Sequence, residues 1–245
     1  MAYILIIGAK SDIAKSLAEV YAKNNYDLYL AGRNIDEIEE FSNTLKEKNN
    51  IEVKLKEFDV VKFNLHEEFY KSLEEKPFGV ILVAGFYPDQ KEAELNWEIS
   101  LKSINVNYVG PISILNIAAN EMEKNKKGFI VGVSSVSGDR GRQKNYIYGS
   151  SKGGLSTYLS GLRNRLFKKG VHVLTVKPGF VETKMTKGLN LPKKFTAQPL
   201  EVADDIFSAQ KNKKDILYTR WIWKYIMIVI RNIPEFIFKK TDIWW

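Results

Sequence analysis

The chain has 245 residues, of which 44% are hydrophobic, so it is long enough for one large domain with a full core. It contains no cysteine and only two histidines, His66 and His172, which excludes thiolate sites and argues against a histidine-rich metal site or a Ser-His-Asp triad. We therefore expect no metal. The net charge is +8, but the lysines are spread along the chain and form no nucleic-acid motif, so no nucleic-acid partner is expected.

Short apolar runs alternate with amphipathic stretches of helical length. The strands are expected at Tyr3–Ile7, Asp27–Ala31, Glu52–Phe58, Gly79–Val83, Gly128–Val133, Val171–Lys177 and Asp215–Tyr218. The helices are expected at Ser11–Lys23, Ile35–Lys48, Leu65–Glu75, Glu98–Glu123, Tyr148–Lys168 and Leu200–Ala209. Strands separated by helices of this length predict an α/β fold: a three-layer, Rossmann-type, doubly wound parallel sheet of about seven strands.

The domain organisation follows from the same pattern. Residues 1–219 are predicted to form a single nucleotide-binding domain, because no linker divides them, and residues 220–245 a C-terminal amphipathic helical tail. Met1 runs straight into an apolar segment without a basic region or cleavage site. We therefore expect no signal peptide, and a cytoplasmic or peripherally membrane-associated protein.

The first strand leads into a turn and a helix at Gly8-Ala9-Lys10-Ser11-Asp12-Ile13-Ala14. Gly8 allows a tight reversal, and the helix start at Ser11, Asp12 and Ile13 offers free N–H groups to a pyrophosphate. A full glycine fingerprint would have glycine at positions 12 and 14. Asp12 is a candidate helix cap, but its carboxylate would repel a pyrophosphate unless it points away.

Four further strand ends carry candidate cofactor contacts. Arg33 follows the second strand, where an arginine accepts a 2′-phosphate and so favours NADPH; the alternative is that it stacks on adenine or is solvated. The other candidates are Asp59 and Val60 after strand three, Ala84 and Gly85 after strand four, and Pro178, Gly179, Val181 and Thr183 after strand six. All lie at carboxyl ends of parallel strands, where ligands of such sheets bind.

Tyr148 and Lys152 occupy positions i and i+4 of a predicted helix and so share one face. A cation beside a phenol favours the phenolate and lowers its pKa toward neutrality. Such a phenol can exchange a proton with a carbonyl oxygen or an alcohol, and Ser135, at a strand end, can hydrogen-bond the same oxygen. The pattern predicts a ketone–alcohol redox site; a surface tyrosine with a solvated lysine is the alternative.

These residues, in this order and spacing, resemble the short-chain dehydrogenase/reductase family over nearly the whole chain. The resemblance implies that Ser135 orients the carbonyl, Tyr148 is the acid/base, and Lys152 tunes Tyr148 and holds the nicotinamide ribose. It also implies that Asn107 supports a water that relays protons, and that Tyr148 and Lys152 contact a bound NADH or NADPH. A generic short-chain ketone or 3-oxoacyl reductase is one function within this family.

A closer resemblance, to the decaprenylphosphoryl-2-keto-ribose reductases, is carried by three segments: Gly8–Ala14, Gly138–Gln143 and Ile233–Phe236. It implies reduction of the 2-keto group of a polyprenyl-phosphate-linked pentofuranose to an arabinofuranose donor for cell-wall glycans. It also implies a partner oxidase that makes the ketone, and a reaction usually written with NADH. Arg140 and Arg142 are candidates for the substrate phosphate, with plain solvation as the alternative.

The segment from Arg220 to Ile233 is almost wholly aromatic or aliphatic, apart from a stripe formed by Arg220, Lys224 and Arg231. Its fourteen residues make about 21 Å of helix, too short for a hydrocarbon core of about 30 Å. The pattern is typical of an interfacial helix, so a membrane surface is an expected partner. The alternative is a helix that packs in the core or in a dimer, and a homo-oligomer is expected in either case. A membrane-attached, cofactor-binding regulator is the non-enzymatic alternative.

Overall fold

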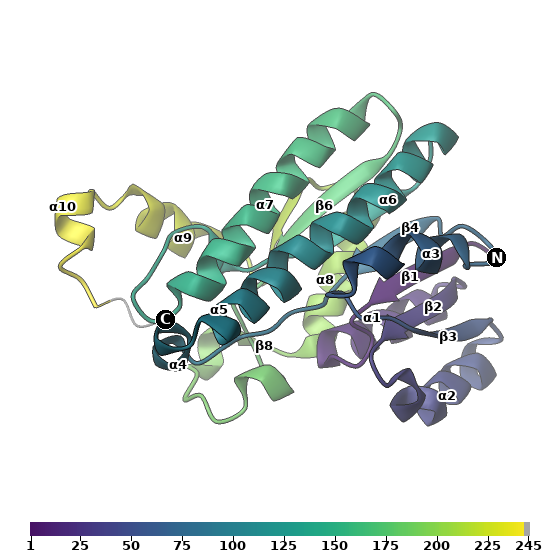
Figure 1. Cartoon of the computed structure of the whole chain (residues 1–245), viewed down its shortest axis with the longest axis horizontal. Coiled ribbons are helices and arrows are strands. Elements are labelled where there is room, and N and C mark those ends of the chain that lie inside the picture. The colour runs from purple at the N-terminus through teal and green to yellow at the C-terminus, as the bar shows by residue number, and fades with distance from the viewer. Residues whose placement is uncertain (243–245) are drawn as a thin grey trace.

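The computed structural model describes residues 1–242, and its centre is one seven-stranded parallel sheet (Figure 1). The strands are β1 (Tyr3–Ile7), β2 (Asp27–Gly32), β3 (Val53–Glu57), β4 (Gly79–Leu82), β5 (Phe129–Val133), β6 (His172–Lys177) and β9 (Ile216–Tyr218). Their order is β3-β2-β1-β4-β5-β6-β9. The predicted doubly wound sheet is confirmed, and the order in which strands are added reverses between β1 and β4, the point where such sheets bind ligands.

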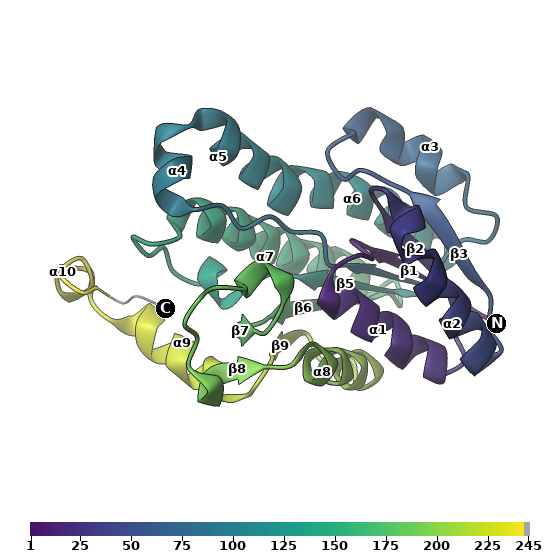
Figure 2. The same cartoon turned by 90° about the horizontal axis from the view of Figure 1, so that it is seen from below.

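Helices cover both faces of the sheet and give three layers (Figure 2). On one side lie α1 (Asp12–Lys23), α2 (Glu39–Asn49) and α8 (Pro199–Lys211); on the other lie α3 (His66–Lys71), α6 (Gly110–Asn125) and α7 (Tyr146–Phe167). Side chains of a strand point alternately to the two faces. Ile4 and Ile6 therefore enter one core while Leu5 and Ile7 enter the other, which explains why β1 is an unbroken apolar run.

The helix predicted from Glu98 to Glu123 is interrupted. It consists of α5 (Trp97–Ile104), a π-helical turn (Asn105–Val109) and α6. Pro111 has no N–H, and its ring would clash with the carbonyl of Asn107 in a regular helix, so the ladder changes register here. The sequence pattern of apolar residues does not reveal this change, because Pro111 lies close to the start of a new helical segment.

Several short elements were not predicted. They are α4 (Gln90–Leu95), a separate pair of strands, β7 (Phe180–Val181) and β8 (Thr196–Ala197), and 3-10 turns at Ile35–Ile38, Phe63–Leu65, Val136–Gly138, Lys184–Thr186 and Lys193–Phe195. Five of these additions follow β5 or β6. They build the loops that rise above the carboxyl edge of the sheet, where the candidate site lies.

The tail forms α9 (Ile222–Asn232) and α10 (Glu235–Phe238), which extend from one end of the molecule (Figure 1). One stripe of α9, formed by Trp223, Met227 and Ile230, is buried against Val136. No helix in residues 1–242 combines the length and apolarity needed to cross a bilayer.

The predicted basic stripe needs one correction. Arg220 precedes α9, with a left-handed backbone (φ 54°). Its guanidinium donates to the carbonyl of Lys194 at 2.8 Å and pairs with Glu201 at 3.3 Å. The side chain of Arg220 is therefore bound to residues of the main domain. Only Lys224 and Arg231 remain as exposed cations along α9.

Candidate active site

Two adjoining cavities lie along the carboxyl edge of the sheet and contain almost all the predicted site residues. The first, of about 500 Å³, is lined by Gly8, Ser11, Arg33, Asp59, Val60, Ala84 and Gly85. The second, of about 740 Å³, is lined by Ser11, Asp12, Ile13, Gly85, Ser135, Arg142, Tyr148, Lys152, Pro178, Gly179, Val181 and Thr183. Both share Lys10, Ser11 and Gly85, so they form one continuous cleft.

The turn after β1 brings two backbone segments very close together. Gly8 has φ +88°, and a Cβ at this position would lie 2.7 Å from the backbone nitrogen of Ala84, so only glycine fits. The cap of α1 is Ser11, whose hydroxyl accepts the N–H of Ala14 at 3.2 Å. The first N–H groups of α1 face the cleft beside it, as an anion site requires.

Asp12 is not the helix cap that the sequence suggested. Its carboxylate accepts the backbone N–H of Lys184 at 2.7 Å, which ties α1 to the turn after β7. Ser11 takes the capping role because its extended backbone (φ −74°, ψ 151°) suits a cap, whereas Asp12 is already helical. The carboxylate of Asp12 is thus held by the backbone of the Lys184 turn.

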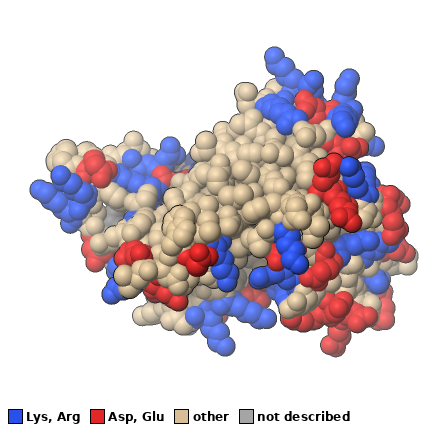
Figure 3. Space-filling view, in the orientation of Figure 1, with Lys and Arg blue, Asp and Glu red and all other residues tan. Residues whose placement is uncertain are grey.

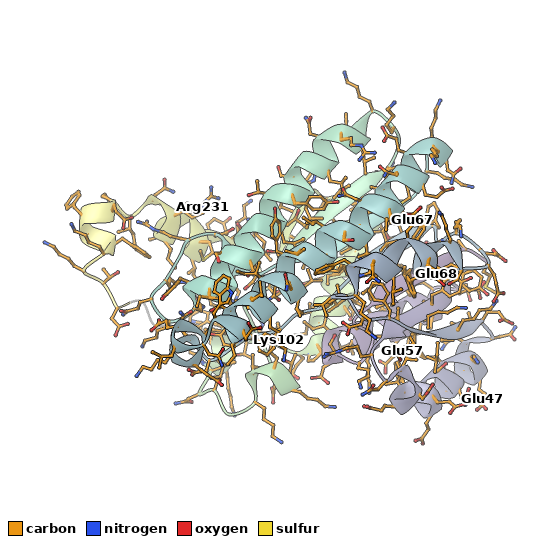
Figure 4. The ribbon with its side chains drawn as sticks, viewed as in Figure 1. Glu47, Glu57, Glu67, Glu68, Lys102 and Arg231 are labelled. Atoms are coloured by element: carbon orange, nitrogen blue, oxygen red, sulfur yellow. The ribbon has the colours of Figure 1, made fainter. Side chains whose placement is uncertain are left out.

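Arg33 lies at the end of β2, in the first cavity with Lys10. The loop that carries Arg33 is fixed by Glu57 of β3, whose two carboxylate oxygens accept the N–H groups of Asn34 and Ile35, each at 3.1 Å (Figure 4 labels Glu57). Lys10 pairs with Glu37 at 2.7 Å. Arg33 and Lys10 therefore place two cations in the first cavity, where a 2′-phosphate is expected.

Ser135 and Tyr148 lie together in the second cavity. Ser135 follows β5, and its hydroxyl accepts the N–H of Ser137 at 3.1 Å, which fixes the side chain. Tyr148, in the first turn of α7, makes a side-chain hydrogen bond with Ser135. Burial raises the pKa of Tyr148 above its ordinary value, and the hydrogen bond with Ser135 opposes this effect. The phenol is therefore protonated at neutral pH and can donate its proton.

Lys152 lies one helical turn beyond Tyr148 and is buried. Its ammonium donates to the carbonyl of Val133 at 3.0 Å and lies 5.8 Å from the centre of the Tyr148 ring. Burial lowers the pKa of Lys152 to about 8. The ammonium of Lys152 is bonded to Val133, and at the phenol burial is the largest effect and raises the pKa of Tyr148. A lowering of the Tyr148 pKa by Lys152 stays a prediction.

Asn107 is buried in the π-helical turn, outside the two cavities. Its amide nitrogen donates to the carbonyls of Phe86 (2.7 Å) and Ser103 (2.8 Å), and its oxygen accepts the N–H of Phe86 (3.0 Å). The side chain therefore fixes the turn after β4 that contains Gly85. A water-relay role for Asn107 stays a prediction.

The two arginines proposed for a substrate phosphate lie in different surroundings. Arg140 donates to the carbonyls of Ile230 and Ile233, both at 2.6 Å, pairs with Glu235 at 2.8 Å and stacks on Phe238 at 3.6 Å. The phosphate role for Arg140 is therefore wrong, because its guanidinium holds the tail.

Arg142 instead lines the second cavity beside Tyr148, where burial lowers its pKa. Its role toward a phosphate stays a prediction.

Tyr87 and Trp223 are among the pocket residues that the sequence analysis missed. Tyr87 packs edge-to-face on Tyr148 with ring centres 4.8 Å apart, and Trp223 of α9 lines the same cavity. Tyr87 could have been found because it follows Gly85 at a strand end. Trp223 could have been found from its spacing with Met227 and Ile230, which marks an inward helical stripe.

The cleft fits a nicotinamide dinucleotide on the geometry of the protein alone. The strained glycine turn and capped helix start suit a pyrophosphate, the two cations suit a ribose phosphate, and the Ser135–Tyr148 pair lies at the other end. Fold and site together define a nicotinamide-dependent oxidoreductase.

Comparisons with known proteins identify the family. Residues 2–194 match the family model described as short chain dehydrogenase. An uncharacterized oxidoreductase of Mycobacterium tuberculosis is 32% identical over 240 residues, covering 97% of this chain and 96% of that protein. A bovine 3-oxoacyl-[acyl-carrier-protein] reductase is 31% identical over 188 residues, covering 76% of this chain and 78% of that protein. The chain belongs to the short-chain dehydrogenase/reductase family.

Solved structures share the fold. A short-chain dehydrogenase from Sphingobium yanoikuyae in complex with NADPH superposes with a TM-score of 0.84 at 19% identity, over 96% of this chain and 97% of that one. A short-chain dehydrogenase from Burkholderia cenocepacia in complex with NADP has a TM-score of 0.82 at 18% identity, over 94% and 93% of the two chains. The Rossmann-type architecture is thus common to proteins with little sequence in common with this one.

Proposed function

We propose that the protein is a reductase that uses NAD(P)H, with a preference for NADPH, to convert a ketone into a secondary alcohol. The observation that carries the proposal is the hydrogen-bonded pair of Ser135 and Tyr148, with Lys152 one turn away, at the inner end of a cleft that fits a dinucleotide. The bovine relative named as a reductase and the structural neighbour from Sphingobium named as a dehydrogenase support the same class of enzyme.

Each residue has a definite task in the proposed reaction. The nicotinamide supplies hydride when it is bound. Ser135 donates a hydrogen bond to the substrate carbonyl oxygen and Tyr148 protonates that oxygen, so negative charge does not accumulate there. Lys152, charged below a pH of about 8, holds the ribose and compensates a phenolate after the proton has left. Tyr87 and Trp223 cover the reacting centre and exclude water.

The preference for NADPH rests on Arg33 and Lys10 in the outer cavity. Guanidinium and ammonium groups bind phosphate oxygens by charge-assisted hydrogen bonds. The structural neighbours from Sphingobium and Burkholderia, described as complexes with NADPH and NADP, are consistent with this preference.

The cavity suggests a ketone that combines an apolar part with an anionic one. Phe180, Leu191 and Trp223 give it an apolar wall, and Arg142 supplies a buried cation. A 3-oxoacyl substrate fits this description, and the bovine relative named as a 3-oxoacyl-[acyl-carrier-protein] reductase supports it. A polyprenyl-phospho-2-keto-pentose, supplied by a separate oxidase, fits the same description and is the second candidate, favoured by Arg142.

Steady-state oxidation of NADPH and NADH by the purified protein tests the proposal. The substrates are a 3-oxoacyl thioester, a polyprenyl-phospho-2-keto-pentose and a simple cyclic ketone, each with wild type and with Tyr148→Phe. Turnover of one ketone by wild type alone supports the proposal and selects the substrate class. If none of the three is reduced while the cofactor still binds, a cofactor-binding regulator becomes the better description.

A further inference from the structure

The helix α9 has two apolar stripes on opposite sides, whereas a surface helix normally has one. The inward stripe, Trp223, Met227 and Ile230, is buried. The outward stripe contains Trp221, Tyr225 and Val229, with exposed fractions of 73%, 58% and 65%. Ile228 on α9 and Phe236 and Ile237 on α10 extend the exposed apolar surface. We call these six outward residues the tail patch.

Cations surround the tail patch. Lys224 and Arg231 flank the outward stripe of α9, and Lys239 and Lys240 follow Phe236 and Ile237. The two acidic residues of the described tail are both paired, Glu235 with Arg140 and Asp242 with Lys144. Figure 3 shows Lys and Arg gathered on the lobe formed by α9 and α10, whereas Asp and Glu are frequent at the opposite end, where Figure 4 labels Glu47, Glu57 and Glu67.

We propose that the tail patch docks on the surface of an anionic lipid bilayer. Aromatic side chains next to lysines suit the headgroup region, where ring and charge are both accommodated. An anionic surface complements the exposed charge of Lys224 and Arg231. A symmetric dimer through the same patch would bring these cations against their own copies, and it would leave them without counter-charges.

Docking through the tail patch would place the cleft close to the bilayer. Trp223, on the inward stripe of α9, lines the substrate cavity, so the lipid surface and the cavity lie on opposite sides of one helix. A protein docked in this way receives amphipathic substrates from the bilayer beside its pocket. The docking does not depend on the proposed reaction, since it rests on the outward residues alone.

Co-sedimentation with lipid vesicles tests the docking. Full-length wild type is compared on vesicles of phosphatidylcholine with about one quarter phosphatidylglycerol and on phosphatidylcholine alone. We expect wild type to partition at least tenfold better onto the anionic vesicles, and 0.5 M NaCl to remove most of this advantage. The combined variant Trp221→Ser, Tyr225→Ser and Val229→Ser should lose at least tenfold in partitioning, as should Lys224→Glu with Arg231→Glu.

The matched control replaces three exposed apolar side chains elsewhere, Leu95→Ser, Trp97→Ser and Phe167→Ser, and should bind vesicles as wild type does. Circular dichroism and thermal melting verify that all variants are folded. Wild type that does not partition, or a tail-patch variant that partitions as wild type does, would overturn the proposal. The proposal would also be overturned if wild type formed a dimer, the triple serine variant were monomeric and neither bound vesicles. That result would assign the patch to contact with a second copy of the chain.

Discussion

Trp223 of α9 lies directly over Gly179, so that a Cβ at position 179 would come within 2.0 Å of the indole ring. The indole is fixed on its other sides, because Nε1 donates to the carbonyl of Phe195 at 3.1 Å and the ring packs edge-to-face on Phe180 at 5.1 Å. The absence of a side chain at Gly179 thus permits the tail to close the substrate cavity.

Gly179→Ala should therefore destabilise the protein. Overpacking of a fixed site costs about 1–3 kcal/mol, which corresponds to a fall in melting temperature of roughly 2–12 °C for a chain of this size. Gly141→Ala is the control, because a Cβ there meets no atom within 4 Å. Adding Trp223→Leu to Gly179→Ala should recover part of the loss. Equal melting temperatures for the two alanine variants would contradict the packing argument.

Tyr148→Phe should lower kcat for ketone reduction by about 10²–10⁴-fold, the range for loss of a positioned acid. Tyr146→Phe, two residues away and exposed, is the matched control and should keep wild-type turnover. Cofactor titration should show that both variants still bind NADPH, so that the loss lies in proton transfer. Equal turnover in both variants would remove Tyr148 from the mechanism.

The affinity for NADPH should depend on pH through Lys152. Burial lowers the pKa of this lysine to about 8, so it is charged below that pH and neutral above it. A plot of log Kd against pH should therefore be flat up to about pH 8 and then rise as the cation is lost. Lys152→Met should bind more weakly and without this bend, whereas Lys168→Met should keep it. Fluorescence titration from pH 6 to 10 measures all three proteins, and a bend that survives Lys152→Met would point to another group.

Arg33→Gln should change cofactor preference. A charge-assisted hydrogen bond contributes about 1.5–3 kcal/mol, so the KM for NADPH should rise about 10–150-fold while that for NADH changes little. Lys62→Gln removes an exposed cation beyond β3 and should leave both values unchanged. If Arg33→Gln raises the KM for NADPH and the KM for NADH equally, Arg33 stabilises the loop and does not bind the 2′-phosphate.

Arg140→Gln should release the tail without affecting binding of charged substrates. The variant loses two bonds to helix carbonyls, the pair with Glu235 and the stack on Phe238, so cleavage by trypsin after Lys239 and Lys240 should become at least tenfold faster. Arg165→Gln, which loses the ion pair with Glu123 between α7 and α6, should be cleaved at the same rate as wild type. A large increase in substrate KM with unchanged proteolysis would restore the phosphate role to Arg140.

The sheet and its strand-end loops could be predicted because buried parallel strands are continuous apolar runs and their carboxyl ends share one edge. Gly8, Arg33 and Gly85 could be assigned to one cleft on that basis alone. The role of Arg140 could not be predicted, since its partners lie at least 90 residues away and leave no local pattern. Asp12 was the predicted helix cap, but Ser11 takes this role, and the sequence does not distinguish them because both side chains can accept the N–H of the first turn.

The tail shows a different limit of sequence patterns. Apolar residues all around a helix indicate that it is covered on every side, but they do not say by what. The structure assigns Trp223, Met227 and Ile230 to the protein core and leaves Trp221 and Tyr225 outside. Sequence periodicity gives the position of each side chain around the helix axis, whereas the long-range contact with Gly179 decides which side faces inward.

The position of Trp223 in the chain also sets the order in which the enzyme is completed during synthesis. Among the described residues that line the substrate cavity, Trp223 is the last to leave the ribosome, more than thirty positions after Leu191. All seven strands of the sheet and the other described lining residues precede Trp223 in the chain, so the cavity receives its last wall when α9 folds over Gly179.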